Sequence, residues 1–245
     1  MRQAYSLLAD RASIVSAIYG PAGEVFSNII SDPPQYRSPN TKAEFSPEKA
    51  TALLEEAGWK KGADGVREKD GVKLSVLYQT TVNSVRQKTQ QIIKDAHEKA
   101  GIKTELKSID SGVFFSSDVG NPDTAAHFYA DIEMYTSYNV LPDPQSYFEG
   151  WLTEEIAQKA NQWSGNNYTR WSNPEFDQLF EQAKVELDEQ KRAPLFIRMN
   201  DLIINNYVHI PLVLRKTVFA HTNALKNVNY SIWDVQVWNI ANWMK

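Results

Sequence analysis

The pattern of apolar and polar positions in the middle of the chain predicts a strand, a helix and a second strand. Residues Leu74–Gln79 form a short, mainly apolar run, and Asn83–Ala100 repeats apolar residues at helical spacing. Residues Ile102–Ile109 then alternate between apolar and polar side chains, as a half-buried strand does. Because the links are short, we expect parallel strands joined by a right-handed crossover. A third strand is predicted over Asp131–Tyr138, so the fold class is α/β with a mainly parallel sheet flanked by helices.

The residues at two further positions predict the starts of helices. The sequence SPE at 46–48 offers a capping serine, a proline suited to the first turn and an acidic residue for the positive end of the helix dipole. The sequence SNPE at 172–175 repeats this opening. A last helix is predicted over Glu189–Asn206, where Pro194 is tolerable only within the first turn.

Three further segments outside the strand–helix–strand region have patterns of their own. Residues Met1–Tyr19 have helical spacing, in which Asp10 or Ser13 can cap a second helix. Residues Lys60–Gly71 are charged and glycine-punctuated, which predicts a solvated hairpin. The final segment, Val208–Lys245, is first strand-like and then rich in asparagine and aromatic residues. We therefore expect a boundary near residues 206–211.

Composition narrows the classes of function. The 245 residues are 42% hydrophobic and 23% charged, and the net charge is −4. This charge argues against binding to nucleic acid or to anionic membranes. With no cysteine there is no disulfide framework and no thiolate ligand or nucleophile. No apolar run reaches about 18 residues, the length that a membrane span requires.

Motifs for catalysis are missing from the sequence. The four histidines stand apart from one another, and the sequence contains neither G-x-S-x-G nor a glycine-rich phosphate loop. We expect no metal and no cofactor. One enzymatic alternative stays open, a hydrolase of peptides or glycosides that uses carboxylates such as Asp110, Asp131 and Asp143.

The stretch Tyr135–Gly150 (YTSYNVLPDPQSYFEG) is the first candidate for a binding site. In α/β sheets, ligands bind beyond the carboxyl ends of the strands. Here those ends are residues 78–80, 109–111 and 137–143, which carry tyrosine, amide, hydroxyl and carboxylate groups. Such groups suit hydrogen bonding and stacking on a small polar solute.

Five segments, in order, resemble the family 5 extracellular solute-binding proteins, the peptide and nickel class of ABC importers. They are MRQAYSLLADRASIVSAIYG, FSPEKATALLEEAGW, LPDPQSYF, WSNPEFDQLFEQA and NNYVHIPLV. The segments span nearly the whole chain, but they correspond only to the second half of the family's sequence. The resemblance therefore implies the fold of one lobe of a type II periplasmic binding protein.

The resemblance also implies a division of the chain and a mode of action. Residues 1–207 would form the C-terminal lobe, and residues 208–245 would return to complete a first lobe. In the family, a ligand is clamped between the two lobes by hinge closure. The implied role is the substrate-binding component of an ABC importer, with membrane permease subunits as partners and no enzymatic activity. A ligand-sensing module is an alternative that the sequence does not separate from import.

The site residues implied by the resemblance lie on the third strand and the loop after it. In peptide-binding members an aspartate three residues before the acid–proline pair holds the peptide's amino terminus. A valine, Val140, occupies that position here, so a sugar, an opine or a metal chelate is an alternative solute. Asp143 has an alternative role as a turn residue that bonds local amides. The candidate ligand-binding residues are Tyr78, Met134, Ser137, Tyr138, Asn139, Val140 and Asp143.

Two expectations concern the setting of the protein. The resemblance implies a periplasmic or extracellular location, free or lipid-anchored, although no signal-peptide pattern follows Met1. Without a first lobe, the strands of Val208–Lys245 would expose their edges, which favours pairing between copies. We expect this segment to be rearranged or to mediate self-association.

Overall fold

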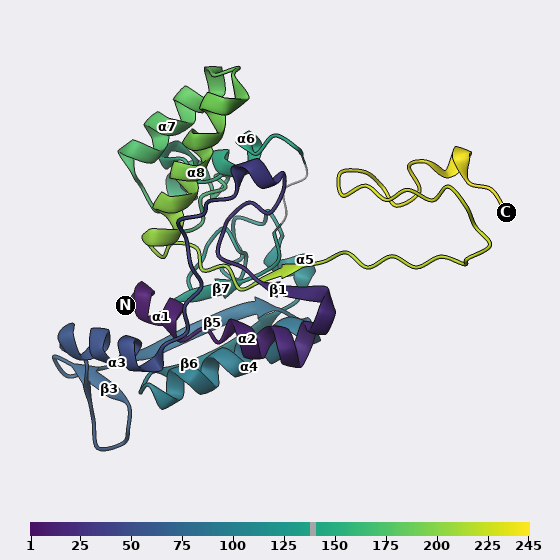
Figure 1. Cartoon of the computed structure of the whole chain (residues 1–245). Coiled ribbons are helices and arrows are strands. Elements are labelled where there is room, and N and C mark those ends of the chain that lie inside the picture. The colour runs from purple at the N-terminus through teal and green to yellow at the C-terminus, as the bar shows by residue number, and fades with distance from the viewer. Residues whose placement is uncertain (138–140) are drawn as a thin grey trace.

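The computed structural model describes residues 1–137 and 141–245, and its centre is a three-stranded parallel sheet (Figure 1). Strands β5 (Ser75–Thr81), β6 (Lys103–Ile109) and β7 (Ile132–Met134) lie in the order β6-β5-β7. Helix α4 (Ser84–Lys99) connects β5 to β6, and both neighbours of β5 run parallel to it. The predicted strand–helix–strand unit and the α/β class are confirmed. Strand β7 is shorter than the predicted Asp131–Tyr138.

The helices begin where the sequence provides a side-chain acceptor. Asn83 Oδ1 accepts the amides of residues 85 and 86 at the start of α4, both at 3.1 Å. Ser46 Oγ accepts the Lys49 amide at 3.3 Å and starts α3 (Pro47–Glu56). Asn173 Oδ1 accepts an amide at 3.1 Å and starts α7 (Pro174–Val185). These contacts satisfy amides that have no partner within the helix.

The expectation for Pro194 is wrong. Helix α8 (Glu189–Asn205) begins after Asp188, so Pro194 is its sixth residue and lies beyond the first turn. Proline has no N–H group, and the carbonyl of Gln190 therefore lacks its usual helical donor. The helix continues because its apolar face is buried against the rest of the helical layer.

The remaining elements are short. The helical turns α1 and α2 precede a π-turn, η1, and the small strands pair in two antiparallel sheets. Their bounds are α1 Arg2–Leu7, α2 Arg11–Ile14, η1 Val15–Tyr19, η2 Gly20–Ala22, β1 Gly23–Val25, η3 Pro34–Tyr36, β2 Lys60–Lys61, β3 Arg67–Lys69, β4 Val72–Lys73, α5 Ser111–Phe114, α6 Gln145–Glu149, η4 Thr153–Glu155, η5 Lys159–Asn161, β8 Val213–Arg215 and η6 Ile240–Asn242.

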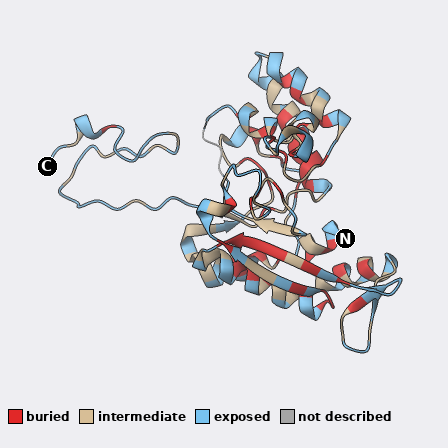
Figure 2. Cartoon of the chain, turned by 180° about the vertical axis from the view of Figure 1, so that it is seen from behind, coloured by how far each residue is buried: buried red, intermediate tan, exposed pale blue. Residues whose placement is uncertain are grey.

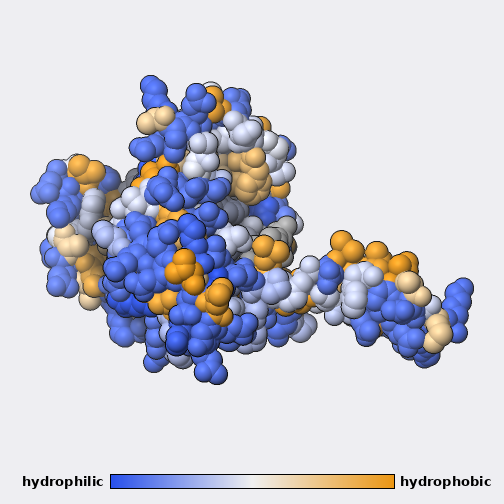
Figure 3. All heavy atoms as spheres, turned by 90° about the horizontal axis from the view of Figure 1, so that it is seen from above, coloured by the Kyte–Doolittle hydropathy of each residue, from blue (hydrophilic) through white to orange (hydrophobic). Residues whose placement is uncertain are grey.

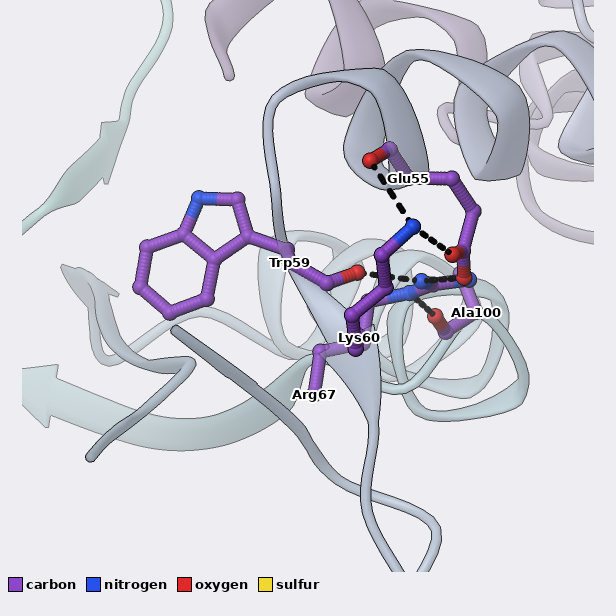
Figure 4. A network of polar contacts seen from close by, with 5 residues as sticks. All are labelled: Glu55, Trp59, Lys60, Arg67 and Ala100. Atoms are coloured by element: carbon purple, nitrogen blue, oxygen red, sulfur yellow. Dashed lines mark hydrogen bonds and ion pairs between the residues drawn. The ribbon is translucent and has the colours of Figure 1, made fainter. Parts of the chain in front are cut away.

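Arg67 ties the predicted hairpin to the body. Strands β2, β3 and β4 form an antiparallel sheet, and Arg67 on β3 is 2% exposed. Its guanidinium donates to the carbonyls of Ala100 at 2.6 Å and Trp59 at 2.7 Å and pairs with Glu55 (Figure 4). Lys60 reaches the other oxygen of Glu55 at 3.1 Å. One buried cation thus joins the hairpin to the ends of α3 and α4.

A separate apolar core holds the helical layer together. Helices α6, α7 and α8 pack around four fully buried side chains, Phe148, Phe176, Phe196 and Met199. The buried segments gather in this layer and along the central strands (Figure 2). The helical layer stands above the sheet in Figure 1.

The C-terminal segment crosses the body once and then leaves it. Strand β8 pairs antiparallel with β1, and the Lys216 amide donates to the carbonyl of Ala22 at 2.8 Å. After Lys216 the chain extends away from the body as an arm, defined here as residues 217–245 (Figure 1). The strand-like pattern of Val208–Lys245 therefore yields the strand Val213–Arg215 within the body, and the arm is mostly exposed (Figure 2).

Candidate functional site

An aromatic cluster lies where the parallel strands end. Helix α5 follows β6 directly, and Asp110 caps it by accepting the amide of Gly112 at 2.8 Å. This turn brings Phe115 to 5.8 Å from the ring of Tyr135, which follows β7. Phe115 is 56% exposed and Tyr135 is 39% exposed. The edge of the sheet thus presents aromatic rings to solvent, as the position of the strand ends predicts.

The alternation of β5 and β7 divides their side chains between two faces. Tyr78 is 2% exposed and packs with Ile14 and Ile93 on the face that helices α2 and α4 cover. Its hydroxyl donates to the Met134 sulfur at 3.2 Å, so Met134 lies on the same face. The structure does not bring these two predicted residues to the exposed edge, and burial raises the pKa of Tyr78. Their contact with a ligand stays a prediction.

The opposite face carries a polar row that sequence reasoning missed. Lys107, Gln79 and Glu133 occupy paired positions across β6, β5 and β7. Lys107 is paired with Asp123, and the Gln79 side-chain amide donates to Glu133. Glu133 is half-buried, and this desolvation raises its pKa to about 8. A carboxyl group that is protonated at neutral pH therefore lies two residues before the exposed Tyr135 on the same side of the strand.

Arg170 lies near Glu133 without forming an ion pair with it among the described residues. Its Nη2 donates to the His127 carbonyl, and its Nε donates to the Ala157 carbonyl at 3.1 Å. The guanidinium also stands over the Trp163 ring at 5.3 Å. The charge of Arg170 lowers the pKa of Glu133, but the effect of burial is larger. Arg170 is thus held by backbone carbonyls, and Glu133 keeps its proton.

The alternation of side chains in β7 is the sequence feature that could have predicted this row of polar residues. In DIEMY, Ile132 and Met134 point to the helix side, so Glu133 and Tyr135 must point to the other. Alternation alone predicts that the face carrying Glu133 is the solvated one. The sequence does not show which segments bury that second face of the strand. This burial is what raises the pKa of Glu133.

Asp143 fixes the loop before α6. Arg192 of α8 donates to both of its oxygens, at 2.7 and 3.1 Å, and the Gln145 amide donates to Oδ1 at 2.9 Å. Partial burial opposes ionisation of Asp143, but these hydrogen bonds outweigh it and lower its pKa. Ser137 is exposed. The geometry of Asp143 agrees with the turn role that the sequence left open.

Three of the predicted residues, Tyr138, Asn139 and Val140, lie outside the described residues. The three carboxylates of the hydrolase alternative are engaged at separate places. Asp131 accepts the Leu77 amide at 2.8 Å, while Asp110 caps α5 and Asp143 binds Arg192. Within residues 1–137 and 141–245, no cluster of three acidic or histidine side chains could hold a metal ion.

A small cavity adjoins the loop after α5. Its volume is about 210 Å³, and His127, Trp163 and a set of hydroxyl side chains from that loop line it. His127 is buried, and its Nδ1 lies 2.6 Å from the Thr124 hydroxyl. A larger cavity of about 480 Å³ lies between α1, α3 and the end of α8, away from the strand ends.

Comparison with known proteins identifies the family. Residues 1–159 match the family "Bacterial extracellular solute-binding proteins, family 5 Middle". This match covers more than half of the chain, so the chain belongs to this family of solute-binding proteins, which are not enzymes.

Similar proteins in curated collections bind peptides. The chain is 26% identical over 251 residues to the oligopeptide-binding protein AppA of Bacillus subtilis, covering 98% of this chain and 44% of that protein. It is 25% identical over 240 residues to di/tripeptide-binding protein 3 of Pseudomonas aeruginosa, covering 97% of this chain and 40% of that one. The chain therefore spans less than half the length of these relatives.

Solved structures support the type II periplasmic-binding-protein fold. An oligopeptide-binding protein of Thermus thermophilus, complexed with a pentapeptide, superposes with a TM-score of 0.78 at 28% identity, over 87% of this chain and 37% of that one. NikZ of Campylobacter jejuni, in complex with Ni(L-His), gives a TM-score of 0.78 at 20% identity, over 100% of this chain and 48% of that one, and it supports the fold alone.

Among the described residues, no helix combines the length and apolarity that crossing a membrane would take.

Proposed function

We propose that this chain forms one jaw of a two-lobed receptor that captures a peptide for an ABC importer. The observation that carries the proposal is the exposed pair Phe115 and Tyr135 at the carboxyl ends of β6 and β7, with the exposed Ser137 two residues further along the chain. Exposed rings near hydroxyl groups suit a peptide, which offers apolar side chains and amide groups together. The peptide-binding relatives support this choice of ligand.

The test is ligand-induced stabilisation of the full-length protein that carries this chain. A panel of di- to pentapeptides is expected to raise its melting temperature, because a ligand bound only to the folded state stabilises it by mass action. Sugars and metal chelates serve as matched panels for the alternative solutes. Phe115→Ala should weaken the peptide effect, and Val72→Ala, an exposed change on the distant hairpin, should leave it intact. A shift with sugars or chelates alone would contradict the peptide assignment.

We also propose that residues 1–207 are the C-terminal lobe and that residues 208–245 return to complete a first lobe. In support, the arm exposes apolar side chains that a soluble protein normally covers, which are orange in Figure 3. They include Val218, Ile232 and Val235, whose exposed fractions range from 63% to 75%. By the same division, the full protein would work outside the cytoplasm, either free or held by a lipid anchor. Its partners would be the membrane permease subunits of the importer.

Limited proteolysis of the isolated chain tests this division. Proteases are expected to cut within residues 217–245 at low dose, because exposed backbone without a packed neighbour is the preferred site of cleavage. In the full-length protein the same segment should resist. If the isolated arm resists as well, sedimentation distinguishes the two explanations: a dimer would support pairing between copies, and a resistant monomer would indicate that the arm folds back on its own lobe.

A further inference from the structure

The small cavity beside the loop after α5 adjoins the aromatic cluster. Ser116, which lines the cavity, directly follows Phe115 of that cluster in the chain. Further along the same loop, the Ala125 amide donates to the Phe114 carbonyl at 2.7 Å and holds the loop against α5. The cavity volume of about 210 Å³ lies below the ~300 Å³ at which pockets for whole small molecules begin. The cavity therefore has room for one side chain of a bound peptide rather than for a complete ligand.

The lining of this cavity runs from buried to exposed residues. Thr124 and His127 are 1% and 4% exposed, and the His127 Nδ1 lies 2.6 Å from the Thr124 hydroxyl. Asp118 and Ser164 line the same cavity and are exposed. A side chain that enters from the exposed residues thus exchanges water for protein contacts along its length.

One wall of the cavity is aromatic. The ring centres of Trp163 and His127 are 4.4 Å apart, and Tyr129 meets the Trp163 ring edge-on at 5.9 Å. Trp163 and Gln162 have φ angles of 59° and 55°, a left-handed conformation that few residues other than glycine adopt. Arg170 is tied to backbone carbonyls and does not line the cavity, but its guanidinium stands over the Trp163 ring at 5.3 Å. Such a wall suits the apolar stem of a long side chain whose head is a cation.

Asp118 supplies the charge of the cavity. It is the one acidic residue in the lining, and no lysine or arginine of the described residues lines the cavity. Its Oδ1 accepts the Gly120 amide at 2.9 Å. In the part of the chain that the structure describes, Asp118 forms no ion pair, whereas the nearby Asp123 pairs with Lys107. A carboxylate with free acceptor capacity binds an ammonium or guanidinium group through charge-assisted hydrogen bonds, while a purely aliphatic side chain would leave the polar lining unpaired.

We propose that this cavity binds a long cationic side chain of the captured peptide, that of lysine or arginine. The subsite rests on the proposed function, and it makes peptides with such a side chain the preferred ligands. The stem of the side chain lies along Trp163 and His127, and its charged head donates to Asp118. The aromatic cluster around Tyr135 then contacts other parts of the peptide, and the cavity selects one residue of its sequence.

The experiment measures peptide affinity in the full-length protein by calorimetry. A pentapeptide of alanines carries one lysine, which is moved through the five positions, and each lysine peptide is matched with one that carries norleucine. Norleucine has the same aliphatic stem without the charge. At one position the lysine peptide is expected to bind at least about tenfold more tightly, because a hydrogen bond between charged groups is stronger than a neutral contact. In Asp118→Asn this ratio should fall towards one, with the affinity for the norleucine peptide nearly unchanged.

The matched control is Asp70→Asn, which removes a negative charge from an exposed position on the distant hairpin. It should keep the full lysine-to-norleucine ratio. Asp118 is exposed, and an asparagine oxygen can also accept the Gly120 amide, so Asp118→Asn is expected to fold. Trp163→Leu tests the wall: it should weaken the lysine and norleucine peptides alike and leave the all-alanine peptide unchanged.

The outcomes separate the subsite from the proposed function. If the peptides bind but lysine exceeds norleucine at no position, the subsite is overturned and peptide capture stands. A lysine preference that persists in Asp118→Asn also overturns it, because the cation would then be held elsewhere. A loss for the all-alanine peptide in Trp163→Leu equal to that for the other two would show that Trp163 supports the site as a whole, which contradicts the wall. If no peptide binds to the unchanged protein, peptide capture fails and the subsite fails with it.

Discussion

Replacing Asn167 with alanine is expected to lower the free energy of unfolding by about 2–4 kcal/mol, because several buried partners lose their hydrogen bonds at once. Asn167 is 1% exposed. Its side-chain amide donates to the carbonyls of Trp151, Leu152 and Trp171 at 3.2, 3.0 and 2.8 Å. One side chain therefore ties the start of the loop between α6 and α7, at Trp151 and Leu152, to its end at Trp171.

The same change should weaken ligand binding. Asn167 immediately precedes Tyr168 and lies three residues before Arg170, and both of these residues neighbour Glu133. A loosened loop would no longer hold them in place. Chemical denaturation of the chain measures the loss of stability, and peptide titration of the full-length protein measures the loss of affinity.

Asn166→Ala is the matched control for this prediction. Asn166 is adjacent and exposed, and its side chain bonds only the carboxylate of Glu155 among the described residues, at 3.1 Å. Its loss should cost less than about 0.5 kcal/mol, the usual range for a surface substitution. Equal effects of the two changes would mean that Asn167 does not organise the loop.

Replacing Glu133 with glutamine is expected to change how the stability of the chain depends on pH. Burial raises the pKa of Glu133 from its usual 4.5 to about 8 in the folded chain. Between these values the folded state holds a proton that the unfolded state has released. The free energy of unfolding must therefore fall as pH rises from about 4.5 to about 8. The expected loss is on the order of a few kcal/mol, at about 1.4 kcal/mol per unit of pKa shift.

Glu133→Gln removes this loss, since glutamine does not ionise and has a similar shape. Denaturation curves at about pH 4 and about pH 9, on either side of this range, should show the variant close to the unchanged chain at the lower pH and more stable at the higher. Glu105→Gln on the exposed surface of β6 should behave differently, because the hydrogen bond from Lys103 lowers the pKa of Glu105. If the free energies of unfolding of Glu133→Gln and of the unchanged chain differ by the same amount at both pH values, Glu133 is ionised normally.

The polar row and the burial of Tyr78 differ in how far the sequence could predict them. Glu133 could have been suspected from its place between Ile132 and Met134, because strand alternation is a local property. The placement of Tyr78 inside the core could not be predicted, because a strand has two faces and the sequence does not say which one helices will cover.

The sequence by itself determined the local starts of the helices, the parallel strand–helix–strand unit and the family. Caps such as Ser46, Asn83 and Asn173 act within four residues, so their effect is written in short stretches of sequence. Only the tertiary structure decided which face of the sheet stays polar, why Glu133 holds its proton and where the arm leaves the body. Each of these depends on desolvation and charge from segments far apart in the chain, and such effects exist only once the chain is folded.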